Sequence, residues 1–427
     1  MGPSYRKQLC VAIARVLPVE DFRDIDRRTG CRWGWYPLAM VWLLQILSRG
    51  VSLAERFEES RRWLRGLAPT LRLAGTYQGF VKALRRRGEL LTLWIHAAFQ
   101  DRIRQWWGDA DLVAGFRPLA VDGTRFDCPR SRSCQRRFRL AGRDKSPPQL
   151  TLTSLWHLGV HCWWDGRIGP ATTSERTMLR AMLDDLPPRT LLVGDAGFVG
   201  YELCTELTRR GISFLLRVGA NVDLLTHLGW TRSERPDTVY LWPGKCRYQP
   251  PVNLRLIVIG TGRRRVFVVT NVLNPTTLSR RQAADFYRRR WGVETAYRAV
   301  KQTLERRRLH SRSSELAIFE LIGVFFGSWA LSLISLSARR HRRMHHAWSP
   351  AQTTQALRHA LHHLHSHGRS LRRALTNALL KACRSQRRKT RQDWPHKKHD
   401  PLCGAPNIRQ ASLTYILRAQ HLKAMSA

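Results

Sequence analysis

Residues 117–124 read RPLAVDGT, and residues 190–198 read TLLVGDAGF. Each stretch is a short apolar run that ends in an aspartate followed by turn-forming residues, which is the pattern of a buried strand leading into a tight turn. We therefore expect Asp122 and Asp195 to lie at strand ends, where the backbone is rigid enough to hold a metal ligand. An isolated aspartate in such a place is more often a turn or helix N-cap residue, so a third residue must decide the case.

The sequence around these two stretches predicts a mixed α/β sheet. Residues 150–170, LTLTSLWHLGVHCWWDGRIGP, are typical of further strands, and 173–186 and 201–211 have helical periodicity. With 212–218 as the next strand, the expected order is three strands, helix, strand, helix, strand. Residues 221–275 then contain the runs TVYLW, NLRLIVIG and RRVFVVTNV without an intervening helical pattern, which predicts a β-rich insertion.

The two ends differ from this centre, which we place at 114–338. Residues 1–113 are predicted to form a helical N-terminal domain, either a reader of DNA ends or a helical packing module. Residues 321–338, LIGVFFGSWALSLISLSA, are apolar enough to resemble a membrane span. The serines and glycines in this stretch favour instead a buried helix packed on the sheet, and we expect no membrane partner.

Residues 339–427 are predicted to be a basic, partly helical tail, because they contain 19 lysines and arginines against only Asp393 and Asp400. The histidine-rich stretch 359–367, HALHHLHSH, permits a metal site. It has no carboxylate or cysteine at a fixed spacing, so a solvated basic surface is the simpler interpretation.

The whole chain of 427 residues has 73 lysines and arginines against 31 acidic residues, a formal charge of +42. Such an excess indicates a polyanionic partner, and nucleic acid is the first candidate. The nine cysteines include no C-x-x-C pair, so the sequence suggests neither a zinc ribbon nor a disulfide framework. This composition is typical of a reducing cytoplasm, where we expect association with the nucleoid.

The third residue comes from residues 286–304, FYRRRWGVETAYRAVKQTL. Tyr287, Arg290, Glu294 and Lys301 follow one another at offsets of 3, 4 and 7, so on a continuous helix they share one face. Gly292 weakens the assumption of one straight helix. A phosphate bridged through a metal ion would explain why an arginine and a lysine accompany this carboxylate.

The spacing Tyr-x2-Arg-x3-Glu-x6-Lys resembles that of the DDE transposases of the fourth insertion-sequence family. The resemblance extends to DGT at 122–124, DAGFVGYEL at 195–203 and FLLRVGAN at 214–221, and covers about residues 115–338. It implies a ribonuclease-H-like mixed sheet with a β insertion. In that fold Asp122, Asp195 and Glu294 are the catalytic residues and bind two Mg²⁺ ions, for which Mn²⁺ can substitute.

The resemblance also implies roles for other residues. Tyr287, Arg290 and Lys301 would hold DNA phosphates, and Arg217 would touch DNA. An aromatic residue of the insertion would stack on a flipped base, for which Trp242 and Phe267 are candidates, although each is also explained by core packing. Ala196 stands where the family often has arginine, which removes one phosphate contact.

The function implied is metal-dependent strand cleavage and strand transfer in cut-and-paste transposition, with the second strand cut through a DNA hairpin. The partners would be double-stranded DNA with terminal inverted repeats, target DNA, and a second copy of the chain when two ends are paired. A catalytically inactive, transposase-derived DNA-binding protein is the alternative. A basic protein that coats nucleic acid, with the carboxylates as caps, is a third possibility and requires no metal.

Overall fold

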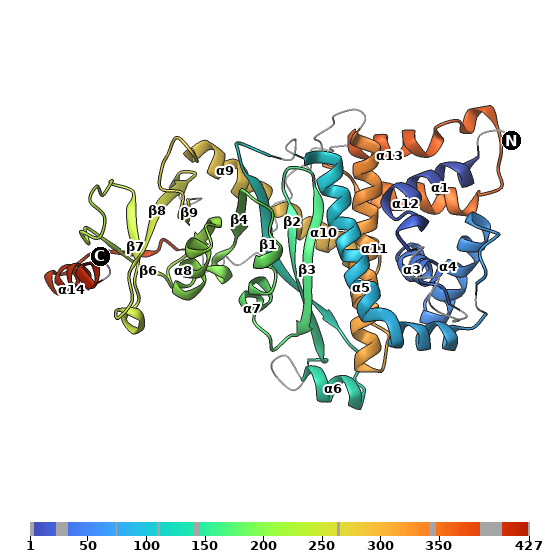
Figure 1. The fold of residues 1–427 in the computed structure, drawn as a ribbon, viewed down its shortest axis with the longest axis horizontal. Coiled ribbons are helices and arrows are strands. Elements are labelled where there is room, and N and C mark those ends of the chain that lie inside the picture. Colours follow the sequence, from blue (N-terminus) through green and yellow to red (C-terminus); the bar gives the residue numbers. More distant parts are fainter. Residues whose placement is uncertain are drawn as a thin grey trace.

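A ten-stranded sheet occupies the middle and one end of the computed structural model, and helices gather at the other end (Figure 1). The structure describes residues 4–22, 33–73, 75–108, 112–139, 146–262, 265–340, 347–384 and 404–425. Within these residues the predicted mixed α/β class is confirmed.

The sheet has the strand order β10-β6-β7-β8-β9-β5-β4-β1-β2-β3. Neighbours β1, β2 and β3 pair antiparallel, whereas β1, β4 and β5 pair parallel. The strands are β1 Arg117–Asp127, β2 Gln149–His157, β3 Cys162–Pro170, β4 Thr190–Gly194, β5 Ser213–Val218, β6 Asp223–Thr226, β7 Thr238–Leu241, β8 Val252–Ile259, β9 Val266–Thr270 and β10 Asn407–Gln410.

Three strands, a helix, a strand, a helix and a strand follow one another as predicted, apart from a short helix between β1 and β2. The long apolar run at 150–170 is an antiparallel hairpin, and its turn ends at His161, which has a φ of 55°. Strand β2 is buried along nearly its whole length because helices cover both of its faces, which explains why the run is apolar without alternation.

The helices are α1 Tyr5–Val16, α3 Trp35–Leu44, α4 Leu53–Leu67, α5 Tyr77–Trp107, α6 Arg132–Phe138, α7 Glu175–Arg180, α8 Tyr201–Arg209, α9 Arg280–Arg289, α10 Trp291–Arg298, α11 Ser314–Arg340, α12 Pro350–His362, α13 Ala374–Arg384 and α14 Leu413–Met425. Short 3₁₀ turns lie at Val19–Phe22, Gln45–Leu47, Leu183–Asp185, Ala196–Phe198, Gly244–Cys246 and Arg369–Leu371, and a π-helical turn spans Ala299–Thr303.

Helix α11 joins the sheet to the helical end of the molecule (Figure 1). On one side Ser328 accepts a hydrogen bond of 3.0 Å from the Trp163 indole on β3. On the other side Gly327 lets Ile46 approach so closely that a Cβ there would lie 2.6 Å from it. The helix is long and apolar enough to cross a membrane, but 78% of its most apolar window is buried inside the protein. The residues predicted as a buried helix are therefore packed on both sides.

Among the described residues from β6 to β9 there are strands and short turns but no α-helix, and this segment extends the central sheet through the antiparallel pairing of β9 with β5. The C-terminal part of the chain differs from the helical tail that we predicted. Residues 407–410 form strand β10, which pairs parallel with β6, and α14 follows it at the far end of the sheet (Figure 1). Four residues gave too short a pattern to identify this strand.

Candidate functional site

Asp122 and Asp195 stand at the same level on neighbouring parallel strands. In the β1–β4 pairing Ala120 is opposite Val193, and each aspartate lies two residues beyond its member of that pair. Side chains two residues apart in a strand point to the same face, and neighbouring strands are about 4.8 Å apart. The topology therefore brings these two predicted residues together. Asp195 follows the last residue of β4 as predicted, but the expected strand end is wrong for Asp122, because β1 continues through it to Asp127 and pairs with β2 along this stretch.

Asp195 is also an N-cap residue. Its Oδ1 accepts a hydrogen bond of 2.9 Å from the Gly197 N–H, which begins the 3₁₀ turn after β4. The structural and the catalytic interpretations of this aspartate are thus compatible, because the cap fixes the direction of the carboxylate.

Glu294 belongs to α10, which packs against β1 and β2. Its Oε1 lies 2.9 Å from Nη2 of Arg290, the residue at which α9 ends and α10 begins. The Arg290 side chain is only 6% exposed, and its Nε and Nη1 atoms have no hydrogen-bond partner of normal geometry in the described chain. Burying a cation with unsatisfied donors costs free energy, which identifies a position that accepts further oxygen ligands.

The electrostatics connect Arg290 with all three carboxylates. Burial raises the pKa of Asp122 to about 7; Arg290 opposes this shift, and the charges of Asp195 and Glu294 add to it. Burial by itself would lower the pKa of Arg290, but Tyr287 and the three carboxylates outweigh it and raise the pKa. Arg290 is therefore the counter-charge of the carboxylate cluster.

Tyr297, three residues after Glu294, ties α10 to β1. Its hydroxyl donates to the Asp122 carbonyl oxygen at 2.8 Å and lies 2.6 Å from the Ser154 hydroxyl. Since a phenol has a single proton, Ser154 must be the donor in the second bond. Burial raises the pKa of Tyr297 well above its usual value, so the hydroxyl remains protonated. This clamp fixes the helix that bears Glu294 against the strand that bears Asp122.

The continuous helix that we expected over 286–304 is wrong in detail. It is divided at Arg290, and a π-helical turn at 299–303 carries Lys301. Gly292 has a packing reason, because a Cβ there would lie 3.0 Å from Nε1 of Trp156 on β2. Lys301 Nζ lies 5.2 Å from the centre of the Phe126 ring, on the strand that holds Asp122.

The remaining predicted phosphate ligands adjoin this cluster. Tyr287 is buried, which raises its pKa, and the nearby cations Arg290 and Arg217 oppose that rise. Arg217 lies on β5, the strand next to β4. Lys301 is half-buried, which lowers its pKa, whereas Asp127 and Asp122 counteract this effect.

Two residues near the site were not anticipated. Glu175 of α7 approaches Gly123 from the face of β1 opposite to Asp122, and a Cβ at Gly123 would displace the Glu175 carboxylate. The charge of Asp195 adds to the burial that raises the Glu175 pKa. Trp291 is 56% exposed, and the Arg290 guanidinium lies 6.0 Å from its ring centre. Its place directly after the motif arginine was the available signal.

Other candidates from the sequence lie elsewhere or are otherwise engaged. Trp242 is buried, and its indole N–H donates to the Gln249 carbonyl oxygen at 2.8 Å. Phe267 is partly exposed on β9. At the Ala196 turn, the Arg176 Nε donates to the Gly197 carbonyl oxygen at 2.7 Å, so an arginine reaches this turn from α7.

The histidine-rich stretch packs on aromatic rings. His359 meets Tyr5 with 5.4 Å between ring centroids, and His362 meets Trp63 at 6.0 Å. Across the described parts of the chain, no three histidine, cysteine, aspartate or glutamate side chains are arranged to hold a metal ion. At the carboxylate cluster, the Arg290 guanidinium lies directly beside Glu294, which explains why the carboxylates are not gathered around a metal position there. The three carboxylates nevertheless form the hard oxygen set that Mg²⁺ and Mn²⁺ prefer.

Comparison with known proteins identifies the class. Residues 114–329 match the model of the transposase DDE domain family, and the chain belongs to that family. The predicted DDE transposase family is thereby confirmed.

The chain is similar to the transposase InsG for insertion sequence element IS4 of Escherichia coli (strain K12), with 26% identity over 224 residues. The match covers 49% of this chain and spans about half (50%) of the length of that relative. The chain is also similar to the solved structure of the piggyBac transposase in a synaptic complex with hairpin DNA. The sequence identity is 13%, and the match covers 93% of this chain and 90% of that one. The TM-score of 0.39 is too low for us to base a conclusion on it.

Proposed function

We propose that this transposase catalyses metal-dependent strand cleavage and strand transfer in cut-and-paste transposition, with Asp122, Asp195 and Glu294 as catalytic residues and ligands of two Mg²⁺ ions. The observation that carries the proposal is geometric: Asp122 and Asp195 lie at one level beside the β1–β4 pairing, and the Tyr297 hydroxyl holds the helix that bears Glu294 and its Arg290 partner against Asp122. Asp122, Asp195 and Glu294 would hold the divalent ions through their carboxylate oxygens, and the ions would supply positive charge beside that of Arg290.

The central strands support assignment to the ribonuclease-H-like folds. Their order β3-β2-β1-β4-β5 combines an antiparallel meander with two parallel strands, and helices connect the parallel pair. Asp122 and Asp195 lie just beyond the last residue pair of the parallel β1–β4 ladder, Ala120 opposite Val193, which places the site where this parallel pairing ends. The segment from β6 to β9 is then the β insertion between the second aspartate and the glutamate.

When bound, two Mg²⁺ ions activate the attacking hydroxyl and stabilise the leaving oxygen of an in-line displacement. The protein supplies positioning and charge. Arg290 exchanges its Glu294 partner for a DNA phosphate and satisfies its two unpaired nitrogens, while Lys301 and Tyr287 contact neighbouring phosphates. Arg217 extends this anionic contact along β5. Tyr297 keeps Asp122 and Glu294 in register throughout.

The partners that we propose are duplex DNA bearing terminal inverted repeats and a target duplex, with two copies of the chain holding the paired ends. The formal charge of +42 suits the DNA partners. We place the protein in the cytoplasm on the nucleoid. Trp291 offers an exposed face for stacking on a displaced base, whereas Trp242 is already packed and hydrogen-bonded.

The test uses purified protein, Mg²⁺ or Mn²⁺, and duplex DNA carrying the inverted repeats that flank its own gene. We expect Glu294→Ala to abolish nicking and end joining while DNA binding in EDTA is retained. Glu202→Ala is the matched control, since that side chain is 81% exposed on α8, and it should cleave like the wild type. Cleavage that survives the Glu294 change would refute the mechanism.

The alternative of an inactive DNA-binding descendant predicts a different result. In that case the wild type would bind inverted repeats but leave them intact with either metal. An active enzyme is favoured because Asp122, Asp195, Glu294 and Arg290 are all present and Asp122 interacts electrostatically with the other three. A protein that merely coats nucleic acid would bind repeat and random duplexes equally and would not respond to metal.

A further inference from the structure

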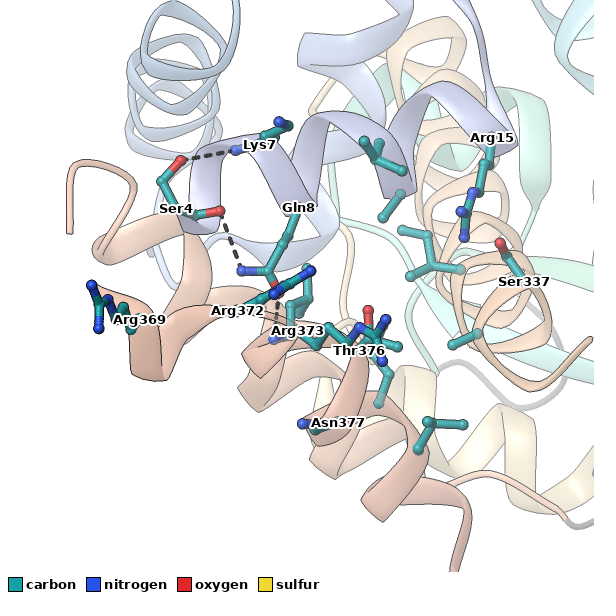
Figure 2. Close-up of a pocket in the computed structure, with 17 residues that line it drawn as sticks. Ser4, Lys7, Gln8, Arg15, Ser337, Arg369, Arg372, Arg373, Thr376 and Asn377 are labelled. Atoms are coloured by element: carbon teal, nitrogen blue, oxygen red, sulfur yellow. Dashed lines mark hydrogen bonds between the residues drawn. The ribbon is translucent and has the colours of Figure 1, made fainter. Parts of the chain in front are cut away.

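A broad basic groove lies in the helical end of the molecule, on the far side of α11 from the sheet. It has a volume of about 1060 Å³ and is formed by α1, the end of α11, the 3₁₀ turn at 369–371 and α13 (Figure 2). Lys7, Arg15, Arg369, Arg372 and Arg373 line it, and none of its described lining residues is acidic. Figure 1 shows α11 and α5 between this groove and β1, so the groove is separate from the carboxylate cluster.

The groove is built from two segments that are remote in the sequence. Gln8 of α1 joins them: its amide nitrogen donates to the Leu371 carbonyl oxygen at 2.7 Å, and its amide oxygen accepts from the Leu375 N–H at 3.0 Å. An isolated antiparallel β-bridge between the backbones of Ser4 and His367 adds a second link at the same edge. These contacts hold the basic side chains of both segments around one cavity.

The five cations have no ion-pair partner in the part of the chain that the structure describes. Arg373 also carries a backbone cost, because its φ of 70° is a left-handed conformation that favours glycine or asparagine. It directly precedes α13, where positive charge opposes the helix dipole. Positive charge gathered at a strained position is explained by an anionic ligand that offsets these costs.

We propose that this groove binds the sugar–phosphate backbone of duplex DNA, independently of sequence and outside the carboxylate site. The lining determines this choice of ligand. Five cations and no described acidic side chain line the groove, which suits the phosphates of a polyanion, and aliphatic residues such as Val11 and Leu379 supply apolar surface for contact with deoxyribose. No aromatic residue is among the described lining, so the groove lacks a platform for base stacking.

The test measures binding of full-length protein to a random-sequence duplex in EDTA, over a series of salt concentrations. We expect the variant Arg15→Gln/Arg369→Gln/Arg372→Gln to bind at least ten-fold more weakly at low salt. The slope of log K against log salt should fall by about 0.9 for each phosphate contact removed. The control Arg132→Gln/Arg136→Gln/Arg209→Gln removes the same charge from exposed sites on α6 and α8 and should lose little affinity.

A single variant guards against loss of folding. Arg373→Asn introduces a residue that tolerates the left-handed conformation, so this variant should fold at least as well as the wild type. It should bind the random duplex several-fold more weakly than the wild type. Equal binding by the groove and control variants would overturn the proposal. If the groove variants kept DNA binding but lost binding of a polyglutamate peptide, the ligand would be an acidic protein segment and the proposal would be wrong. Because no cleavage is measured, these results are independent of the proposed catalytic mechanism.

Discussion

The carboxylate cluster and the basic groove solve opposite electrostatic problems. At the cluster, three acidic side chains share one buried arginine, and burial raises the pKa of Asp122 to about 7. In the groove, five cations surround a cavity with no described acidic neighbour. The cluster has one arginine for three carboxylates and therefore keeps an excess of negative charge, whereas the groove keeps an excess of positive charge. The first therefore suits cations, as the proposed metal chemistry requires, and the second suits a polyanion, as the proposed DNA contact requires.

Of the substitutions that test this comparison, we expect a change at Asp122 to have the largest effect, which is on cleavage activity. Asp122→Asn should reduce cleavage on the order of 10³-fold, because the amide is a poor metal ligand and leaves the phosphoryl charge unsupported. In EDTA the same change should stabilise the fold at alkaline pH. The folded-state pKa of about 7 lies above the ordinary 3.8, so the stability linked to this proton is present below pH 3.8 and lost as pH rises to 7.

The advantage of Asp122→Asn in thermal denaturation should therefore grow between about pH 4 and pH 7 and stay constant above that range. Added Mg²⁺ should stabilise the wild type but not the variant at pH 8. An advantage that is the same at every pH would show that Asp122 is not buried among negative charges.

Removal of the counter-charge should have the next largest effect. Arg290→Met leaves the carboxylates without a guanidinium, and we expect a loss on the order of 3 kcal/mol in urea unfolding with EDTA. Mg²⁺ should restore more stability to this variant than to the wild type, because the ion supplies the missing charge. The neighbouring Arg289→Met breaks a pair with Asp285 whose arginine is 41% exposed, and it should cost less than about 1 kcal/mol. Equal losses for the two variants would contradict the role of Arg290.

The cluster and the groove also differ in how far the sequence predicts them. The cluster was partly predictable, because Asp195 ends an apolar strand pattern and Glu294 belongs to a spaced motif, whereas the strand end predicted at Asp122 is wrong because β1 continues to Asp127. Strand-end position and helical offsets are local properties of a sequence. The same reasoning overestimated the continuity of the helix, because the π-helical turn near Lys301 depends on packing against β1.

The groove was not predictable, because it depends on Gln8 meeting Leu371 and Leu375, more than 360 positions away along the chain. The Glu175 contact with Gly123 has the same origin, since α7 and β1 meet only through the sheet topology. Strand β10 is another such case, because its four residues pair with β6 from the opposite end of the sequence. In each case tertiary contacts between remote segments carry the information, and no periodicity reports them.

Breaking the hydrogen bonds of the Tyr297 hydroxyl should cause an intermediate loss of folding stability. Tyr297→Phe removes the donor to the Asp122 carbonyl oxygen and the acceptor of the Ser154 hydroxyl, which should cost about 1–3 kcal/mol of stability. Ser154→Ala removes only one partner, and the double variant should lose less than the sum of the two single changes. Strictly additive losses in chemical denaturation would show that the two hydroxyls act independently.

The smallest expected effect lies in the groove and has the opposite sign. Arg373→Asn should raise the free energy of unfolding on the order of 0.5 kcal/mol, because asparagine accepts a φ of 70° more readily and no longer places a cation before α13. Arg372→Asn is the matched control, because Arg372 has an ordinary φ of −59° and should gain nothing from relief of backbone strain. Urea unfolding without DNA measures both variants. A loss of stability in Arg373→Asn would mean that this arginine stabilises the fold, and the groove would then not be uncompensated at this residue.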